Sequence, residues 1–269
     1  MTQITPTTID VCMPTWESES VLAGTLENLK NSLQRSHVSL GELIIVDNES
    51  EDQTVNIVEK KCEEYGWTLN IQSTRSSLPE ARQIAISKVD EDWFLFLDDD
   101  VRVSDDYISS MIRVVSPAVG AIQGRKKSKS AAEDSTVGQP STNTDWVRKR
   151  AFRGGTHATL IRTSAASGVN FPPDLEVWED EYLRRHIESE GYLWIFNHQA
   201  IFSHKTQNRH GASWKSGYLQ AKYGLRPFWH TALNIPYALV TGNLPIGQIA
   251  MLFGYLHRCI EQKFYSIKS

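Results

Sequence analysis

Two kinds of hydrophobic pattern alternate along the first 116 residues, and this alternation limits the folds open to the chain. Short apolar runs typical of strands occur at 8–14, 42–47, 67–71 and 93–98. Segments with apolar residues at helical spacing follow them at 17–34, 52–65, 78–88 and 105–115. Such an order predicts an α/β fold, with a mostly parallel sheet and helices on both faces.

Ligands of such sheets bind outside the carboxyl ends of the strands, so the polar residues that end each strand are the candidate site. Because these ends meet at one edge, we expect residues distant in sequence to lie together there. The candidates are Thr15, Trp16, Asp47, Asn48, Arg75 and the triplet Asp98–Asp100.

The triplet follows the apolar run WFLFL and places three carboxylates side by side. Neighbouring carboxylates repel and burial raises their pKa, so a divalent cation is the obvious partner. In an extended chain residues i and i+2 point the same way, which would turn Asp98 and Asp100 toward a ligand and Asp99 elsewhere. Mg²⁺ and Mn²⁺ take such oxygen ligands together with substrate phosphates. A solvated loop or a helix N-cap is the structural alternative.

The other strand ends have both functional and structural interpretations. Asp47 is placed to accept hydrogen bonds from a ribose or a base, or to form a turn. Arg75 suits a phosphate group or is surface charge, and for Arg82 alone surface charge is favoured. Trp16 could stack on a base or pack in the core.

Composition narrows the class of protein and its compartment. A net charge of −4 argues against a general nucleic-acid binder. Three widely spaced cysteines form neither a zinc-ligand spacing nor a disulfide framework, which indicates a reducing compartment. The first residues carry no secretory signal pattern. We therefore expect a cytoplasmic protein, one that could lie at the inner face of the cell membrane.

The rest of the chain divides into three parts. Residues 124–150 are rich in Ser, Thr, Gly and Lys and predict a long loop, either a lid or a solvated segment. The regular pattern resumes with a strand at 156–162, a helix at 178–192 and two short strands at 193–197 and 199–204. Residues 227–257 contain no Asp, Glu, Lys or Arg, but Asn, Pro and Gly interrupt them. We expect helices there that lie on a membrane surface or pack on the domain.

Five segments of the chain, in this order and spacing, resemble the family 2 glycosyltransferases with the GT-A fold. The segments are IDVCMPTWESESVLAGTLENLKNSL, LIIVDNESEDQT, RSSLPEARQIAI, LFLDDDV and WEDEYLRRHIESEGY. The resemblance covers about residues 7 to 205. Two departures are Trp16, where a tyrosine or phenylalanine is more usual, and Glu17 followed by Ser18, where the family often has Asn or Glu after the aromatic residue.

The resemblance implies roles for single residues. Thr15, Trp16 and Asp47 would hold the nucleotide, and Asp98 and Asp100 would bind a metal and the diphosphate. The acidic pair Glu179 and Asp180 implies that Asp180 is the general base. His204, after the later strands, often approaches the metal or the diphosphate in related enzymes, although a lone histidine is as often structural.

These inferences predict a metal-dependent, inverting glycosyltransferase with Mg or Mn as cofactor. Its donor would be a nucleoside-diphosphate sugar, UDP- or GDP-linked, and its acceptor a glycan or a lipid-linked molecule, with a peripheral membrane contact and no nucleic acid. The non-enzymatic alternative is a sugar-nucleotide-binding or scaffold protein with the same fold.

Other enzyme classes fit less well. A haloacid dehalogenase phosphatase would carry its Asp-x-Asp after the first strand, a dinucleotide oxidoreductase needs glycines at the first turn, and a sugar-nucleotide pyrophosphorylase needs a glycine- and arginine-rich signature there. The predicted domains are a catalytic domain at 1–210 and a helical, weakly charged extension at 211–269. The catalytic domain comprises a nucleotide-sugar half (1–123), a flexible loop (124–150) and an acceptor half (151–210).

Overall fold

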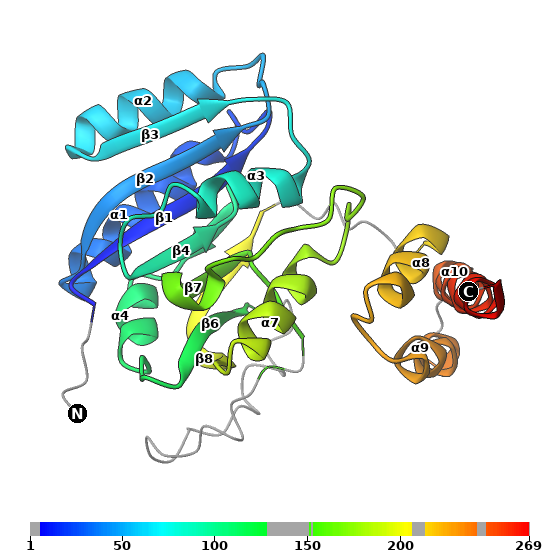
Figure 1. The fold of residues 1–269 in the computed structure, drawn as a ribbon. Coiled ribbons are helices and arrows are strands. Elements are labelled where there is room, and N and C mark those ends of the chain that lie inside the picture. The colour runs from blue at the N-terminus through cyan, green and yellow to red at the C-terminus, as the bar shows by residue number, and fades with distance from the viewer. Residues whose placement is uncertain (1–5, 128–150, 152, 206–212, 241–245, 269) are drawn as a thin grey trace. The chain divides into compact units, whose positions relative to one another are not determined.

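A computed structural model describes residues 6–127, 151, 153–205, 213–240 and 246–268 (Figure 1). The chain forms two compact units. The first unit contains residues 1–171 and 183–207, and the second contains 172–182 and 208–269. The division predicted at residue 210 stays a prediction. The second unit also takes in a short segment from the middle of the chain, residues 172–182.

A sheet dominates the first unit, and its strand order in the described residues is β3-β2-β1-β4-β7-β6-β8-β5. The eight strands are β1 (Thr8–Thr15), β2 (Ser39–Asp47), β3 (Thr68–Ser73), β4 (Trp93–Leu97), β5 (Val101–Val103), β6 (Val119–Lys126), β7 (Ala158–Arg162) and β8 (Leu193–His204). The strands β3, β2, β1 and β4 run parallel, as the sequence predicts. Beyond β4 the sheet is mixed, because β7 is antiparallel to both β4 and β6, β8 is parallel to β6, and β5 is antiparallel to β8.

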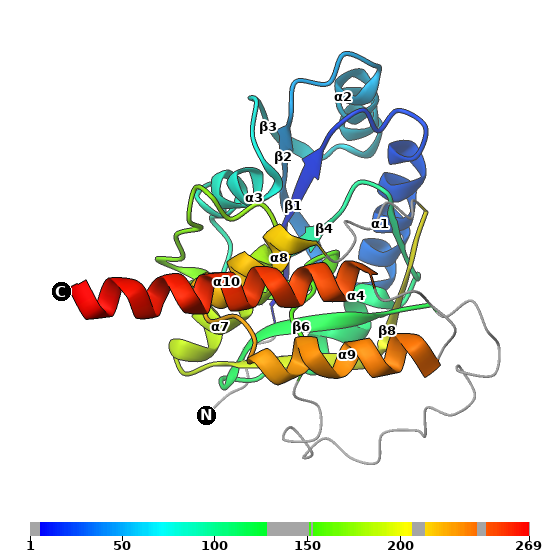
Figure 2. The same cartoon turned by 90° about the vertical axis from the view of Figure 1, so that its right-hand side faces the viewer.

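Helices cover both faces of the sheet, as predicted. Figure 2 shows α3 (Leu78–Ile86) on one side of the strands β1 to β3, and α1 (Leu22–Ser36) and α2 (Thr54–Tyr65) on the other. The core on the α1 side takes alternate residues of β1, beginning with Ile9 and Val11. Cys12 points to the α3 side, where its thiol lies 3.9 Å from the carbonyl oxygen of Ala85. The first unit also contains the short helices α4 (Tyr107–Ile112) and α6 (Thr163–Ala166).

Two predictions about the later strands are wrong. The segments 193–197 and 199–204 form one strand, β8, whose pairing with β6 shifts register between Gly124 and Arg125. The Asn197 amide explains why a polar interruption does not end the strand: its oxygen accepts from the Gln199 N–H and its nitrogen donates to the Ser110 carbonyl. Residues 124–126 belong to β6 rather than to the predicted loop. The remainder of that loop, from 128 to 150, lies outside the described residues.

The second unit carries three helices after the sheet, α8 (Trp214–Lys222), α9 (Phe228–Val240) and α10 (Ile246–Lys268). The helices α8 and α10 pack with their backbones in close approach. A Cβ atom on Gly217 would lie 1.7 Å from the Met251 carbonyl oxygen, and one on Gly254 would lie 1.9 Å from that of Trp214. Glycine at both positions therefore permits this contact.

Large apolar side chains remain exposed on α9 and α10. They are Phe228, Trp229, Leu233, Ile246, Ile249, Phe253, Leu256 and Ile260. None of the helices in the described ranges is both long and apolar enough to cross a bilayer.

Candidate functional site

The acidic triplet forms a tight turn between β4 and β5. The Val101 N–H donates to the Asp98 carbonyl oxygen at 3.1 Å, which closes the turn. The extended geometry assumed for Asp98 and Asp100 is therefore wrong, and the three carboxylates leave the turn toward different partners.

Asp98 lies between two cationic or proton-donating side chains. Its Oδ1 accepts from the Arg82 guanidinium at 3.0 Å, and its Oδ2 lies 2.6 Å from Nδ1 of His157. Burial opposes ionisation of this carboxyl, but Arg82 and His157 outweigh it and hold the pKa of Asp98 well below its usual range. Asp98 is therefore an ionised carboxylate at neutral pH.

Arg82 is a correction to the sequence interpretation, which favoured surface charge. Its side chain is 1% exposed and reaches Asp98 from the buried face of α3, with the ring of Phe96 5.7 Å away. The signal was present in the sequence, because Arg82 falls at helical spacing between the buried Pro79 and Ala85. An arginine on an apolar stripe indicates a buried ion pair rather than a surface charge.

His157 was not predicted, and the sheet explains its position. It immediately precedes β7, whose Ala158 pairs with Leu97 of β4 in antiparallel register, so its carbonyl accepts from the Asp98 N–H at 2.9 Å. No local pattern reveals that β7 runs antiparallel to β4. The sequence alone therefore could not bring His157 and Asp98 together.

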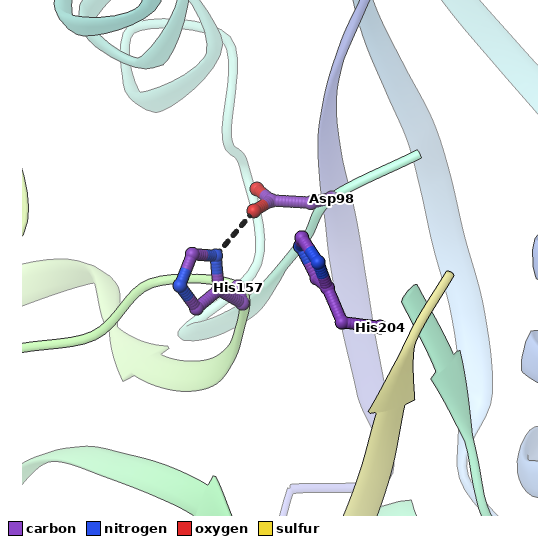
Figure 3. A group of neighbouring side chains, drawn as sticks. All are labelled: Asp98, His157 and His204. Atoms are coloured by element: carbon purple, nitrogen blue, oxygen red, sulfur yellow. Dashed lines mark hydrogen bonds and ion pairs between the residues drawn. The ribbon is translucent and has the colours of Figure 1, made fainter. Parts of the chain in front are cut away.

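His204 arrives from the far end of β8. It pairs with Val101 in the β5–β8 ladder, and its Nε2 lies 3.2 Å from Oδ1 of Asp100. Asp98, His157 and His204 each offer a ligand atom within 4.8 Å of the others, and Figure 3 shows the three side chains converging. We call these three residues together with Asp100 the metal corner.

The donor atoms of the metal corner fit a divalent cation. Carboxylate oxygens suit both Mg²⁺ and Mn²⁺, whereas imidazole nitrogen is a poor ligand for the oxygen-seeking Mg²⁺. Asp98 supplies an ionised carboxylate and His157 and His204 supply imidazoles. The set therefore offers one carboxylate oxygen and two imidazole nitrogens to a divalent cation.

Asp99 turns away from the metal corner to the loop that follows β1. Its carboxylate accepts a hydrogen bond from the Ser18 hydroxyl and a longer one, 3.4 Å, from the Trp16 N–H. Burial raises the pKa of Asp99 to about 6, opposed by the Ser18 hydrogen bond and reinforced by the charges of Asp98 and Asp100. This carboxyl ties the first loop to the acidic turn.

Thr15 and Asp47 meet at the ends of β1 and β2 and are both buried. The Thr15 hydroxyl donates to Oδ1 of Asp47 at 2.9 Å, and Ser50 donates to both Asp47 oxygens through its hydroxyl and its N–H. Asp47 therefore organises the turn, the structural interpretation considered above. A carboxylate has about four acceptor positions, so little capacity remains for a ligand.

Trp16 and Arg75 present their side chains to solvent near this turn. Trp16 is 64% exposed, so its indole is not a core aromatic. Arg75 is exposed in the loop after β3, next to Ser76, whose N–H donates to the Asn48 side chain at 2.8 Å. Both side chains are accessible to a ligand at this edge of the first unit.

Asp180 belongs to the second unit, in the first turn of α7 (Glu179–Ser189). Its Oδ1 accepts from the Glu181 N–H at 2.7 Å, and the helix N-terminus favours its charged form. The preceding Trp178 has φ of 76°, a strained conformation for a bulky residue. Its indole N–H donates to the Ser216 carbonyl of α8 at 2.9 Å, and the Arg226 guanidinium lies 5.0 Å from its ring. Contacts with α8 and with Arg226 thus fix the entry to the turn that carries Asp180.

The sequence matches glycosyl transferase family 2 over residues 10–177, more than half of the chain. The chain belongs to this family. A search among curated protein sequences found no match. The family match includes the β1 turn, Asp47 and the acidic triplet, and it ends just before Asp180.

Solved structures share the fold of this family 2 chain. The mannosyltransferase PcManGT from Pyrobaculum calidifontis, in complex with GDP-Man and Mn²⁺, has a TM-score of 0.62 at 18% identity over 93% of this chain and 69% of that chain. S. aureus TarS 1-349 in complex with UDP has a TM-score of 0.56 at 16% identity over 81% of this chain. Glucosyl-3-phosphoglycerate synthase from Mycobacterium tuberculosis, in complex with Mn²⁺, UDP and phosphoglyceric acid, has a TM-score of 0.52 at 14% identity over 74% of this chain and 71% of that chain.

The chain is shorter than these proteins. It spans 66% of TarS 1-349 and 43% of a longer TarS structure. At these identities the likeness shows a shared fold, and the substrates named for the three proteins remain theirs.

The Arg82–Asp98 ion pair leads to a stability prediction for this family 2 protein. Arg82→Met should lower the free energy of unfolding at pH 7 by about 3 kcal/mol, because it leaves a largely buried carboxylate without its guanidinium. Urea denaturation measures the loss, and Arg75→Met, which removes an exposed arginine, should stay within about 0.5 kcal/mol of wild type.

The pH dependence gives a second check on the same variant. A depressed carboxyl pKa stabilises the fold above the unfolded-state value of about 4, and this contribution is lost as the pH falls toward the folded value. The difference between wild type and Arg82→Met should therefore narrow below about pH 4. Equal stability of Arg82→Met and Arg75→Met at pH 7 would contradict the prediction.

Proposed function

We propose that this family 2 protein is a metal-dependent, inverting glycosyltransferase that moves a sugar from a nucleoside-diphosphate sugar to a hydroxyl of a glycan or of a lipid-linked acceptor. The observation that carries the proposal is the metal corner. Two aspartates of one turn and two histidines from distant strands gather at the strand-end edge of a sheet in a family 2 chain. Structural ion pairing alone would not require both imidazoles beside these carboxylates.

The donor would bind along the ends of β1, β2 and β3. Trp16 offers an exposed indole face for a base, and Arg75 offers a cation for a phosphate. Thr15 and Asp47 would shape the nucleotide site, with Asp47 using the acceptor capacity that Thr15 and Ser50 leave. A UDP- or GDP-sugar is the proposed donor, supported by the UDP and GDP-Man in the complexes of proteins with this fold.

The metal corner would hold Mn²⁺, or Mg²⁺ with weaker use of the histidines, through Asp98, Asp100, His157 and His204. The bound ion would neutralise charge on the leaving diphosphate. Arg82 keeps Asp98 ionised and fixed, so that the carboxylate needs little reorganisation when the ion and the diphosphate arrive.

Asp180 would act as the general base. It would take the proton from the acceptor hydroxyl as that oxygen forms a bond to the anomeric carbon, while the bond from that carbon to the diphosphate oxygen breaks and its electron pair leaves with the diphosphate. Attack on the face opposite the leaving group inverts the anomeric configuration. The anchored Trp178 and the dipole of α7 favour a fixed, ionised Asp180.

A non-catalytic sugar-nucleotide-binding protein is the alternative, and turnover separates the two. The extension at 211–269 is proposed to touch the membrane peripherally, at the inner face of the cell membrane, through the exposed apolar residues of α9 and α10. Such a contact would bring a lipid-linked acceptor to the enzyme.

Metal-dependent donor binding is the first expected outcome. In a thermal-shift panel of UDP-, GDP- and dTDP-sugars, one donor should raise the melting temperature by roughly 5 °C at a hundred times its Kd, and only with Mn²⁺ present. His157→Ala and His204→Ala should lose the Mn²⁺-dependent part, whereas His230→Ala, on α9, should keep it. The purification tag is removed beforehand, since histidine tags bind metals. An unchanged shift in EDTA would refute the metal dependence.

Loss of turnover without loss of donor binding is expected for Asp180→Asn. Removing a general base lowers kcat by about 10²- to 10⁴-fold. Glu179→Gln, in the same turn, is the matched control and should retain most of the activity. Release of nucleotide from the donor, measured with acceptor, reports the rate. If Asp180→Asn turns over at the wild-type rate, another residue is the base.

Vesicle flotation tests the membrane contact. The protein should float with anionic phosphatidylglycerol vesicles, and the double variant Phe253→Ser/Ile260→Ser should remain in the aqueous fraction, because it removes two exposed apolar side chains from α10. Gln262→Ala on the same helix should float like wild type. If the wild-type protein does not float with the vesicles, the proposed membrane contact is wrong.

A further inference from the structure

A hollow of about 400 Å³ lies within the second unit, separate from the metal corner. Its walls come from the segment before α7, from α8 and from α10. The lining residues are Asp174, Glu176, Trp214, Lys215, Tyr218, Leu219, His257 and Glu261. We call it the helical hollow.

Aromatic rings form one wall of the helical hollow. Trp214 and Tyr218 stack with centroids 5.3 Å apart and planes 21° apart, and the His257 ring lies 5.4 Å from that of Trp214. Trp214 nevertheless remains 44% exposed. A rigid, partly open indole braced by a second ring is a flat apolar surface, which suits the C–H face of a sugar ring.

Charged side chains surround this aromatic wall. Glu176 and Lys215 form an ion pair at the rim, with more than half of each side chain exposed. Glu261 accepts from the Tyr218 hydroxyl at 2.9 Å, and this hydrogen bond lowers the pKa of Glu261. The hollow therefore combines an apolar face with ionised acceptors and an ammonium donor, the pairing that sugar hydroxyls require.

The helical hollow is built into the same unit as Asp180. The capping box of Ser213 and Ser216 fixes the first turn of α8, which presents Trp214. The Ser216 carbonyl of that turn also accepts the Trp178 indole N–H, two residues before Asp180. Glu176 is four residues from Asp180, so at most about 14 Å of chain separates their Cα atoms.

We propose that the helical hollow is a binding site for the carbohydrate part of the acceptor, with Trp214 as the stacking platform and Glu176, Lys215 and Glu261 as hydrogen-bonding partners. The identification of the bound carbohydrate as the acceptor rests on the proposed function. Carbohydrate binding itself does not depend on the metal corner. The hollow holds a sugar residue away from the reacting hydroxyl, and the Trp178–Ser216 hydrogen bond keeps it in a fixed relation to Asp180.

Saturation-transfer NMR and calorimetry with disaccharides test the proposal on the full chain without donor or metal. The probes are N,N′-diacetylchitobiose, mannobiose, maltose, cellobiose and lactose. At least one should bind, and Trp214→Ala should weaken that binding about tenfold. Glu176→Gln, an exposed rim substitution that keeps the side-chain shape, should weaken it about threefold. Trp229→Ala removes an exposed tryptophan outside the hollow and should bind like wild type.

Each other outcome overturns the inference. These outcomes are no binding of any probe, equal effects of Trp214→Ala and Trp229→Ala, and a Trp214→Ala variant that loses vesicle flotation but keeps disaccharide binding. If Trp214→Ala unfolds, Glu176→Gln against wild type still decides.

Donor binding separates this inference from the proposed function. Trp214→Ala should keep the Mn²⁺-dependent thermal shift with the nucleotide sugar. If the wild-type protein binds a disaccharide but no nucleotide sugar, the carbohydrate site in the hollow is supported and the glycosyltransferase function is contradicted. If it binds a nucleotide sugar but no disaccharide, only the carbohydrate site in the hollow is contradicted.

Discussion

The neutralisation of a largely buried carboxylate is the constraint on which the strand-end edge of the first unit depends. Asp98 directly follows a fully apolar strand, and its charge is tolerated because Arg82 reaches it from α3 while His157 reaches it from just before β7. Asp99 meanwhile fastens the β1 loop, and Asp100 meets His204. One turn of three acidic residues thus joins four parts of the first unit: α3, the residue just before β7, the loop after β1 and the end of β8.

The chemistry proposed for the protein is divided between the two units. The metal corner and the nucleotide edge belong to the first, whereas Asp180 and the helical hollow belong to the second. The boundary passes through α7 between Tyr182 and Leu183, so one helix carries Asp180, the proposed base, at its start, while its buried Leu183 and Ile187 belong to the first unit. The segment 172–182 therefore belongs to the same compact unit as the helical extension, although it lies within the catalytic domain predicted from the sequence.

Local patterns predicted the parallel half of the sheet, because each strand and helix there follows from its own periodicity and the connections are short. The family resemblance pointed to Asp98, Asp100 and His204, which the structure brings together. His157 was not predicted as a site residue, because its position beside Asp98, 59 residues earlier in the sequence, depends on the antiparallel pairing of β4 with β7. Arg82 was misjudged because it was weighed as a single charge rather than as a member of an apolar stripe. The sequence analysis divided β8 into two strands because the apolar pattern is interrupted at Asn197, whose side-chain hydrogen bonds are visible only in the structure.

The irregularity in β8 bears on which face of the sheet carries the histidine at the end of the strand, His204. Opposite Gly124 and Arg125, β8 advances from Asn197 to Ile201, so it carries extra residues that its neighbour lacks. Successive side chains of a strand alternate between faces, and the parity of this insertion decides which face His204 takes. A one-residue change in the length of this stretch would shift the pairing of the residues after it by one position, and such a shift turns side chains to the opposite face of a sheet. The length of this irregular stretch therefore decides whether the His204 imidazole can reach the Asp100 carboxylate, as it does at 3.2 Å.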